Sequence, residues 1–180
     1  SLGHDHGHEI LRAGNDHNAI QRQRLEYSQR YVAGSGRAVY EKVINVVPNG
    51  VNLTLFNGVE KDYDFRRKYA MDNEKIILFM GRLVYEKGIQ NLIAAMPKIL
   101  QHYNDAKLVV AGKGGMIDEL RNQVNFLGLG NKVYFTGYLG AKDVQKMYKC
   151  ADVAVFPSTY EPFGIVALEG MLSGTPVVVS

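Results

Sequence analysis

Two apolar segments near the C-terminus flank a loop and a helix, and this arrangement constrains the fold more than any other feature. Val153–Phe156 and Pro176–Val179 are short apolar runs typical of strands, and between them lies the segment Glu161-Pro-Phe-Gly-Ile-Val-Ala-Leu-Glu169. A strand, a tight polar loop, a helix and a second strand form one βαβ unit. Because such units bind ligands where strand meets helix, the segment predicts both a parallel sheet and the position of a site.

The same alternation of strands and helices extends through residues 43–180. Besides the two strands above, strands are expected at 43–47, 75–80, 108–111 and 133–136, and helices near 89–100, 120–127 and 144–148. The apolar run at 75–80 is of the kind found in strands that are buried on both faces. Strands and helices joined by short glycine-containing loops predict an α/β, Rossmann-like fold of three layers (αβα) with a mostly parallel sheet.

Residues 1–42 differ in composition from the rest of the chain. They are polar, hold four of the five histidines, and contain a possible helix at 18–32. Gly34-Ser-Gly36 is typical of a flexible join between the two regions. The sequence therefore predicts an N-terminal segment of unassigned role, followed by one domain at 43–180.

Two sets of charged side chains in the N-terminal segment have alternative interpretations. The histidines could bind a metal, although a short run of this kind at a terminus is more often flexible or incidental; they are His4, His6, His8 and His17. The arginines could form a basic arm or line a solvated helix face; they are Arg22, Arg24, Arg30 and Arg37. We expect no metal site among these histidines.

The composition excludes several classes of protein. No run of about 18 apolar residues occurs, so no transmembrane helix is expected. A net charge of +3 is too small to indicate a nucleic-acid partner, but it is compatible with one anionic small molecule. The single cysteine, Cys150, excludes an internal disulfide and indicates a reducing compartment such as the cytoplasm. No histidine adjoins this cysteine, so we expect it to pack in the core.

Polar segments follow four of the expected strands. Ligands of parallel α/β sheets bind at the carboxyl ends of the strands, where these segments should meet. Two cations, several glycines and a carboxylate should therefore converge on one edge of the sheet. The segments are 81–88, 112–115, 137–139 and 158–164.

Arg82 and Lys87 precede an expected helix, and Gly164 opens another. Helix N-termini favour anions because their first N–H groups are unpaired. Arginine can hold a phosphate through two parallel hydrogen bonds, whereas lysine acts as a point charge. The combination suits a diphosphate. Alternatively, Arg82 pairs with Glu86 or a surface acid, and Lys87 is simply solvated.

Glu161 and Glu169 are two carboxylates at different places in the βαβ unit. Glu161 lies in the loop, where a side chain is free to meet a ligand. Glu169 lies within an otherwise apolar helix, and a carboxylate buried there needs a partner. That partner could be a ribose diol, or a lysine or arginine in a structural salt bridge.

The glycine-rich segment and the residues after the strand at 133–136 give weaker signals. Gly112-Lys-Gly-Gly115 lacks the third glycine of a dinucleotide-binding fingerprint, and it could serve only a tight turn between strand and helix. Tyr138 and Leu139 could form the wall of a base pocket or belong to the core.

Six motifs, in this order and at these spacings, form a specific signature. They are Val46-Val-Pro-Asn-Gly-Val51, Gly81-Arg-Leu…Glu86-Lys-Gly88, Val109-Val-Ala-Gly-Lys-Gly114, Phe135-Thr-Gly137, Ala151-Asp-Val-Ala-Val-Phe-Pro-Ser158, and Glu161-Pro-Phe-Gly…Glu169-Gly-Met…Gly174-Thr-Pro-Val177. With these motifs, residues 43–180 resemble the C-terminal, donor-binding domain of the retaining glycosyltransferases of the GT-B fold. The resemblance is to glycosyltransferase family 4 in particular, with glycogen and starch synthases nearby.

The resemblance implies a role for each motif residue. Glu161 would contact the transferred sugar, Glu169 the ribose hydroxyls, and Arg82 and Lys87 the diphosphate of a nucleotide diphosphate sugar. The backbone amides of four residues would cap the phosphates; they are Phe163, Gly164, Ile165 and Val166. The site would be completed by Gly81, Gly112, Tyr138 and Leu139. Transfer would proceed with retention at the anomeric carbon, without a metal cofactor, and with glucose as the favoured sugar.

The sequence departs from this family at both ends. The N-terminal, acceptor-binding domain is expected as a missing partner, because residues 1–42 are too short to be it. The family's sheet is expected to continue beyond Ser180. The chain is therefore expected to be an incomplete half of a GT-B protein, inactive alone. The alternatives are a sugar-nucleotide epimerase of the same fold and a non-catalytic folding fragment.

Overall fold

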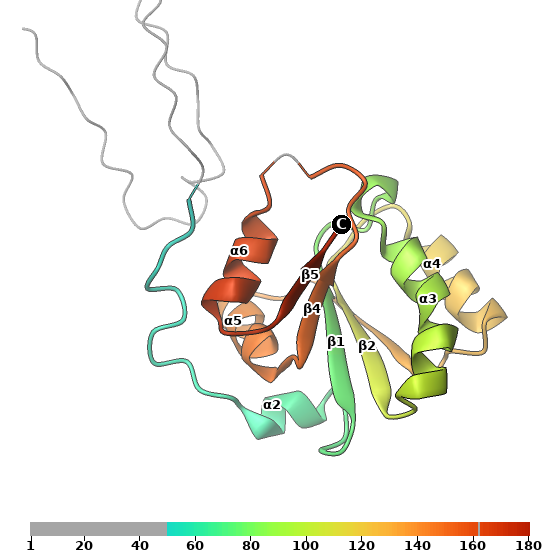
Figure 1. Cartoon of the computed structure of the whole chain (residues 1–180), viewed down its shortest axis with the longest axis horizontal. Helices are drawn as coiled ribbons and strands as arrows, with labels where there is room; N and C mark the ends of the chain where they lie inside the picture. The colour runs from blue at the N-terminus through green and yellow to red at the C-terminus, as the bar shows by residue number, and fades with distance from the viewer. Residues whose placement is uncertain (1–49, 162) are drawn as a thin grey trace, which may run out of the picture. The chain divides into compact units, whose positions relative to one another are not determined.

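A five-stranded parallel sheet runs through the part of the chain that the computed structural model describes, residues 50–161 and 163–180 (Figure 1). Its strands are β1 (Lys75–Met80), β2 (Ala106–Ala111), β3 (Val133–Gly137), β4 (Val153–Phe156) and β5 (Val177–Val179). These are the five strands predicted for this part of the chain, and the predicted Rossmann-like α/β fold is confirmed. The strand expected at 43–47 and the helix expected at 18–32 lie outside the described residues.

Helices cover both faces of the sheet, which gives the three predicted layers (Figure 1). The longer ones are α3 (Ile89–His102), α4 (Ile117–Phe126), α5 (Ala141–Cys150) and α6 (Ile165–Leu172). Two short elements were not predicted, the helix α2 (Tyr63–Arg67) and the 3-10 turn η1 (Tyr85–Lys87). α3 and α4 lie on one face of the sheet, and α2, α5 and α6 lie on the other.

The central strand β1 explains why the sheet is buried on both sides. Its alternate side chains point to opposite faces. Ile77 and Phe79 pack in the core beneath α3 and α4, whereas Ile76, Leu78 and Met80 pack in the core beneath α5 and α6. All five side chains are buried. The continuous apolar run in the sequence is therefore the mark of a strand that contributes to two cores.

The order in which the chain adds strands to the sheet reverses at the central strand β1. From β1 the chain steps outward to β2 and then β3, and it returns to place β4 on the other side of β1, with β5 beyond it. Ligands of open α/β sheets bind outside the carboxyl ends of the strands at such a switch point. The residues that follow β1 and β4 are therefore the expected location of a site.

At the other end of the strands, a buried arginine connects the helix α2 to β1 and β4. The guanidinium group of Arg66 donates to the carbonyl oxygen of Met71 at 2.7 Å, to that of Glu74, and to the carboxylate of Asp152 at 3.4 Å. Asp152 also accepts a hydrogen bond from the N–H of Ile76 at 2.8 Å. This network ties α2 to the amino ends of β1 and β4 and fixes their relative positions.

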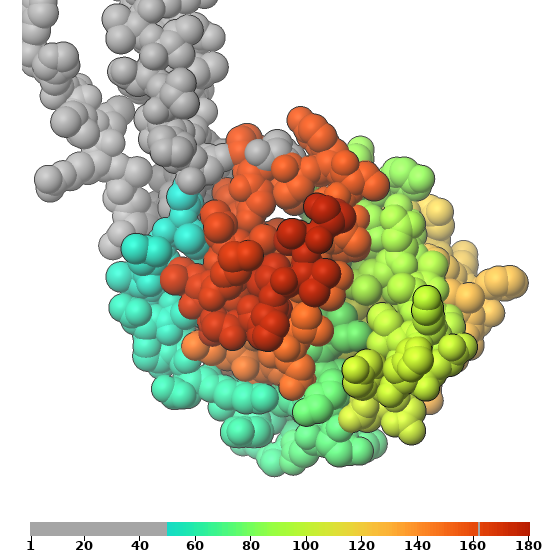
Figure 2. Space-filling view, in the orientation of Figure 1, coloured from blue at the N-terminus to red at the C-terminus, as the bar shows by residue number. Residues whose placement is uncertain are grey.

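The outer strand β5 and the helix α6 pack against each other, and Figure 2 shows this C-terminal part of the chain, in red, on one face of the molecule. Leu168 and Met171 on α6 are exposed, as are Val178 and Val179 on β5. Among the described residues, no strand pairs with the outer side of β5. β5 is thus one edge of the described sheet.

Candidate functional site

The loops that follow β1 and β4 touch each other through their backbones. The N–H of Thr159 donates to the carbonyl oxygen of Glu86 at 2.9 Å. Gly88 has a φ of +68°, and a Cβ atom at this position would lie only 1.8 Å from the carbonyl oxygen of Pro157. Only glycine fits such an approach with this backbone conformation. The two loops are therefore joined at the switch point, where the order in which successive strands are added to the sheet reverses.

An ion pair crosses this junction. The ammonium group of Lys87 donates to Oε2 of Glu161 at 2.6 Å, and the two side chains are only 18% and 27% exposed. The prediction that both residues meet at one edge of the sheet is confirmed. The alternative that Lys87 is merely solvated is wrong, because the second loop supplies a carboxylate for it.

The carboxylate of Glu161 has two further, longer contacts. The hydroxyl of Ser158 lies 3.5 Å from Oε2, and the N–H of Gly164 donates to Oε1 at 3.3 Å. Partial burial raises the pKa of Glu161, but the hydrogen bonds from Lys87 and from the backbone outweigh it, so the pKa lies below its ordinary value. Glu161 is therefore ionised at neutral pH. Ser158 was not predicted as a site residue, although its place directly after β4 was a usable signal.

Arg82 follows β1 a few residues before Lys87, and its side chain is exposed. Within residues 50–161 and 163–180, Arg82 forms no ion pair, neither with Glu86 nor with another acid. The predicted alternative of a structural pairing is therefore wrong for the described part of the chain. Within the described residues, the loop after β1 thus holds one cation with an acidic partner, Lys87, and one without, Arg82.

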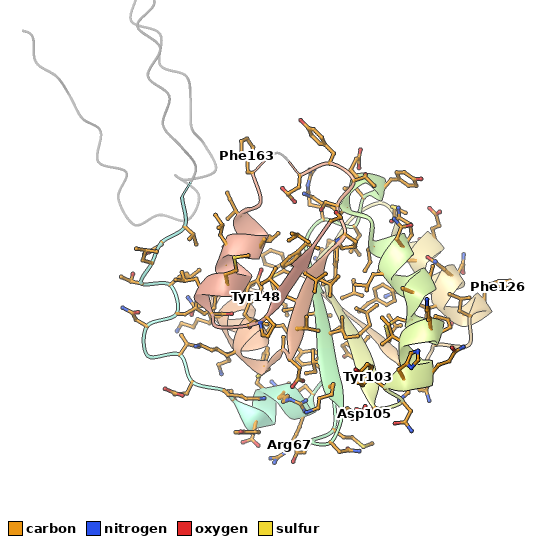
Figure 3. All side chains as sticks on the ribbon, viewed as in Figure 1. Arg67, Tyr103, Asp105, Phe126, Tyr148 and Phe163 are labelled. Carbon is orange, nitrogen blue, oxygen red and sulfur yellow. The ribbon has the colours of Figure 1, made fainter. Side chains whose placement is uncertain are left out.

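The N-terminus of α6 lies beside Glu161. Gly164 caps the helix with a φ of +63°, and no side chain caps it. The first N–H groups of a helix have no partner within it and attract anions, so those of Ile165 and Val166 are available to a ligand. Phe163 is 64% exposed and lies in the loop just before the helix (Figure 3). The predicted amide cluster is thus at the same edge as Lys87 and Glu161.

Glu169 lies further along α6 and is buried, with 6% of its surface exposed. Tyr148 of α5 packs inside the domain, and its hydroxyl donates to the carbonyl oxygen of Val166 at 3.0 Å (Figure 3). Burial raises the pKa of Tyr148 far above its ordinary value, and the neighbouring Glu169 carboxylate raises it further. A neutral hydroxyl therefore lies beside Glu169. Tyr148 was not predicted as a site residue: it only helped to mark the helix expected near 144–148, and helix periodicity does not report its hydroxyl.

The glycines at the ends of β1 and β2 allow their loops to pack closely. A Cβ atom on Gly112 would lie 1.8 Å from the carbonyl oxygen of Gly81, and one on Gly114 would lie 2.2 Å from that of Leu83. The N–H of Leu83 donates to the carbonyl oxygen of Lys113 at 2.9 Å. These contacts support the simpler interpretation of the glycine-rich segment as a tight turn. A ligand contact at Gly81 or Gly112 stays a prediction.

The residues after β3 divide between surface and core. Tyr138 is 73% exposed, so the alternative that it belongs to the core is wrong. Leu139 is half-buried and packs against the core beneath α5 and α6. Cys150 is buried and unpaired, as predicted, and burial raises its pKa. A wall of a base pocket at Tyr138 and Leu139 stays a prediction.

Metal ligands and membrane-spanning helices are both missing from the described part of the chain. Within residues 50–161 and 163–180, no group of three or more His, Cys, Asp or Glu side chains is placed to hold a metal ion. None of the described helices has the length and apolar character needed to span a membrane. The histidines of the N-terminal run lie outside the described residues.

Sequence comparison finds a family and relatives for this chain. The family model described as glycosyl transferases group 1 matches residues 61–180. An uncharacterized glycosyltransferase of Methanocaldococcus jannaschii is 52% identical over 144 residues, which are 78% of this chain and 37% of that protein. A glycogen synthase of Mycobacterium tuberculosis is 34% identical over 137 residues, which are 76% of this chain and 31% of that protein. The chain thus spans about a third of the length of these relatives.

Two solved structures are similar to this one. The C-terminal domain of the group 1 glycosyl transferase LpcC from Francisella tularensis has a TM-score of 0.63 and 29% identity, covering 72% of this chain and 70% of that one. HepE from Anabaena, solved in complex with UDP and glucose, has a TM-score of 0.63 and 30% identity, covering 80% of this chain and 39% of that one. The predicted resemblance to half of a GT-B protein is confirmed at the level of fold.

Proposed function

The chain belongs to the glycosyl transferases group 1 family, and from that premise we propose that it binds a nucleotide diphosphate sugar and presents the sugar for transfer to a hydroxyl group. The observation that carries the proposal is the junction between the loops after β1 and β4. It brings the cation Lys87, the carboxylate of Glu161 and the N-terminus of α6 to the switch point of the sheet. This is where open α/β sheets bind their ligands.

Each charged group has a role that fits its surroundings. Lys87, Arg82 and the N–H groups at the start of α6 would hold the diphosphate. Glu161 would accept hydrogen bonds from the sugar hydroxyls, and the buried Glu169 would accept them from the ribose hydroxyls. We take the sugar to be a hexose, with glucose favoured; the similar HepE structure contains UDP and glucose.

The proposed reaction is transfer with retention at the anomeric carbon. As the bond between sugar and diphosphate breaks, negative charge grows on the departing phosphate oxygen. Fixed positive groups aimed at that oxygen stabilise the transition state more than the ground state. Arg82, Lys87 and the dipole of α6 supply this positive charge, so we propose that no metal takes part.

We further propose that transfer needs a second domain to bind the acceptor. The described sheet and the match to glycosyl transferases group 1 account for one domain, and the chain spans about a third of its relatives. The family match favours a transferase over the epimerase alternative. With its single cysteine, the chain suits the reducing conditions of the cytoplasm.

Calorimetric titration of the 180-residue chain tests the proposal. We expect binding of at least one of UDP-glucose, ADP-glucose and GDP-mannose. Lys87→Ala should weaken that binding about tenfold or more, because a hydrogen bond to a charged group contributes about 1.5–3 kcal/mol. Glu169→Ala should also weaken it. Lys98→Ala, which removes a lysine of α3 away from the site, is the control and should leave affinity unchanged.

The possible results separate the alternatives. Binding that is lost in Lys87→Ala and Glu169→Ala but kept in Lys98→Ala would support the donor site. No binding to any of the three sugar nucleotides would refute it and favour a non-catalytic fragment. Sugar transfer by this chain alone would contradict the proposed need for a second domain.

A further inference from the structure

We propose that Glu161 distinguishes the sugar-bearing donor from the sugar-free nucleoside diphosphate by competing with the diphosphate for Lys87. The inference rests on the proposed function, because it takes Lys87 as the cation that meets the diphosphate. It adds a second task to Glu161, which is to weaken the binding of the product that remains after the sugar has left.

The contacts of Glu161 show which interaction a ligand must displace. Its Oε2 atom lies 2.6 Å from the ammonium group of Lys87. Its contacts with the hydroxyl of Ser158, at 3.5 Å, and with the N–H of Gly164, at 3.3 Å, are much longer. The ion pair is thus the strongest contact of this carboxylate. A diphosphate that takes Lys87 must break it.

The two cations after β1 therefore differ in availability. Arg82 is exposed, and within the described residues it has no acidic partner. Lys87 is largely buried and already neutralised by Glu161. A diphosphate can meet Arg82 without displacing any described group, whereas it reaches Lys87 only by replacing a carboxylate.

The sugar changes the balance of this exchange. When Glu161 leaves Lys87, a sugar-bearing donor offers hydroxyl groups, and hydroxyl-to-carboxylate hydrogen bonds are strong because the acceptor is charged. The diphosphate end of a nucleoside diphosphate carries no such hydroxyls, so the released carboxylate has no new partner there. After transfer, Glu161 and the diphosphate again compete for Lys87, and this favours release of the product. The exchange is of contacts only, with no bond or proton transferred.

Calorimetry with four forms of the full chain tests this inference: the parent, Glu161→Gln, Glu86→Gln and Lys87→Met. The ligands are UDP, ADP and GDP, with the glucose conjugate of each. Glu161→Gln should bind the nucleoside diphosphate about two- to fivefold more tightly, the range expected for removing a partly exposed ion pair. The affinity for the sugar conjugate should rise less or fall. The ratio of the two Kd values should therefore shrink.

Two of the variants serve as controls. Glu86→Gln removes an exposed carboxylate next to Lys87 in the chain, and it should leave the ratio unchanged. Lys87→Met breaks the same ion pair from the other side and should weaken the binding of both ligands. If the pair only stiffened the loops, both Glu161→Gln and Lys87→Met would weaken binding, and the inference would be wrong.

Two other outcomes would also overturn the inference. In one, Glu161→Gln tightens the binding of the nucleoside diphosphate no more than Glu86→Gln does. In the other, it shifts both ligands by the same factor. Both leave the proposed donor site standing. Failure of every form to bind any ligand would instead refute the proposed function, and this inference with it.

Discussion

Replacing Gly88 with alanine is expected to lower the free energy of unfolding by about 2–3 kcal/mol, from two contributions. Gly88 has a φ of +68°, and the left-handed conformation costs a non-glycine residue about 1–2 kcal/mol. The new Cβ atom would lie 1.8 Å from the carbonyl oxygen of Pro157, so the two loops must separate. Separation breaks the 2.9 Å hydrogen bond from Thr159 to Glu86, which contributes about 1 kcal/mol more.

Urea unfolding followed by circular dichroism measures this loss, and two other glycines separate its causes. Gly128 has a φ of +66°, but a Cβ atom added there would meet no described atom within 4 Å. Gly128→Ala should therefore lose only the conformational contribution, about 1–2 kcal/mol. Gly115 has neither constraint, and Gly115→Ala should be neutral or slightly stabilising. If Gly88→Ala were no less stable than Gly128→Ala, the backbone contact between the loops would contribute nothing.

Three further predictions concern individual side chains. Arg66→Leu should lower the free energy of unfolding by about 2–4 kcal/mol, because it removes a buried guanidinium group that donates to three partly buried oxygen atoms; Arg67→Leu, at an exposed ion pair, should change it little in the same urea assay. Folding lowers the pKa of Glu161, so its ion pair stabilises the chain at pH values above the ordinary carboxylate pKa, and this stabilisation is lost as the pH falls through the lower folded value. In urea unfolding, the free energy of unfolding of the parent should therefore exceed that of Glu161→Gln at about pH 7, and the excess should disappear towards about pH 3. Tyr148→Phe should weaken nucleotide-sugar binding severalfold, by removing the hydroxyl beside Glu169, and should lower stability by about 1–2 kcal/mol as measured by calorimetry and urea unfolding. An unchanged affinity would show that this hydroxyl does not position the carboxylate.

The strands were predictable because burial on two faces leaves a strong trace in the sequence. β1 has the predicted bounds, since the strand ends where its apolar run meets Gly81. β2 begins earlier than predicted, at Ala106, because its pairing with β1 includes the polar Lys107. The short helix α2 has five residues, too few to show a 3.6-residue period.

The site was predictable in its location but not in its contacts. Lys87 and Glu161 were each placed after a strand, and parallel strands end at the same edge. Their ion pair spans 74 residues of sequence, and it depends on β4 lying next to β1. That neighbourhood is set by the order of the strands, which periodicity does not report. The exposure of Tyr138 could not be predicted from the sequence either, because a loop residue belongs to no periodic pattern.

The close backbone packing of the loops has a consequence for how such a site can diversify. The loops after β1, β2 and β4 are held by main-chain hydrogen bonds and by glycines at Gly88, Gly112 and Gly114. None of these contacts uses the side chains of Arg82 or Glu161. Substitutions at those two positions can therefore change the chemistry presented to a ligand while the frame stays in place. Such substitutions can therefore alter ligand preference one residue at a time, provided that the three glycines are kept.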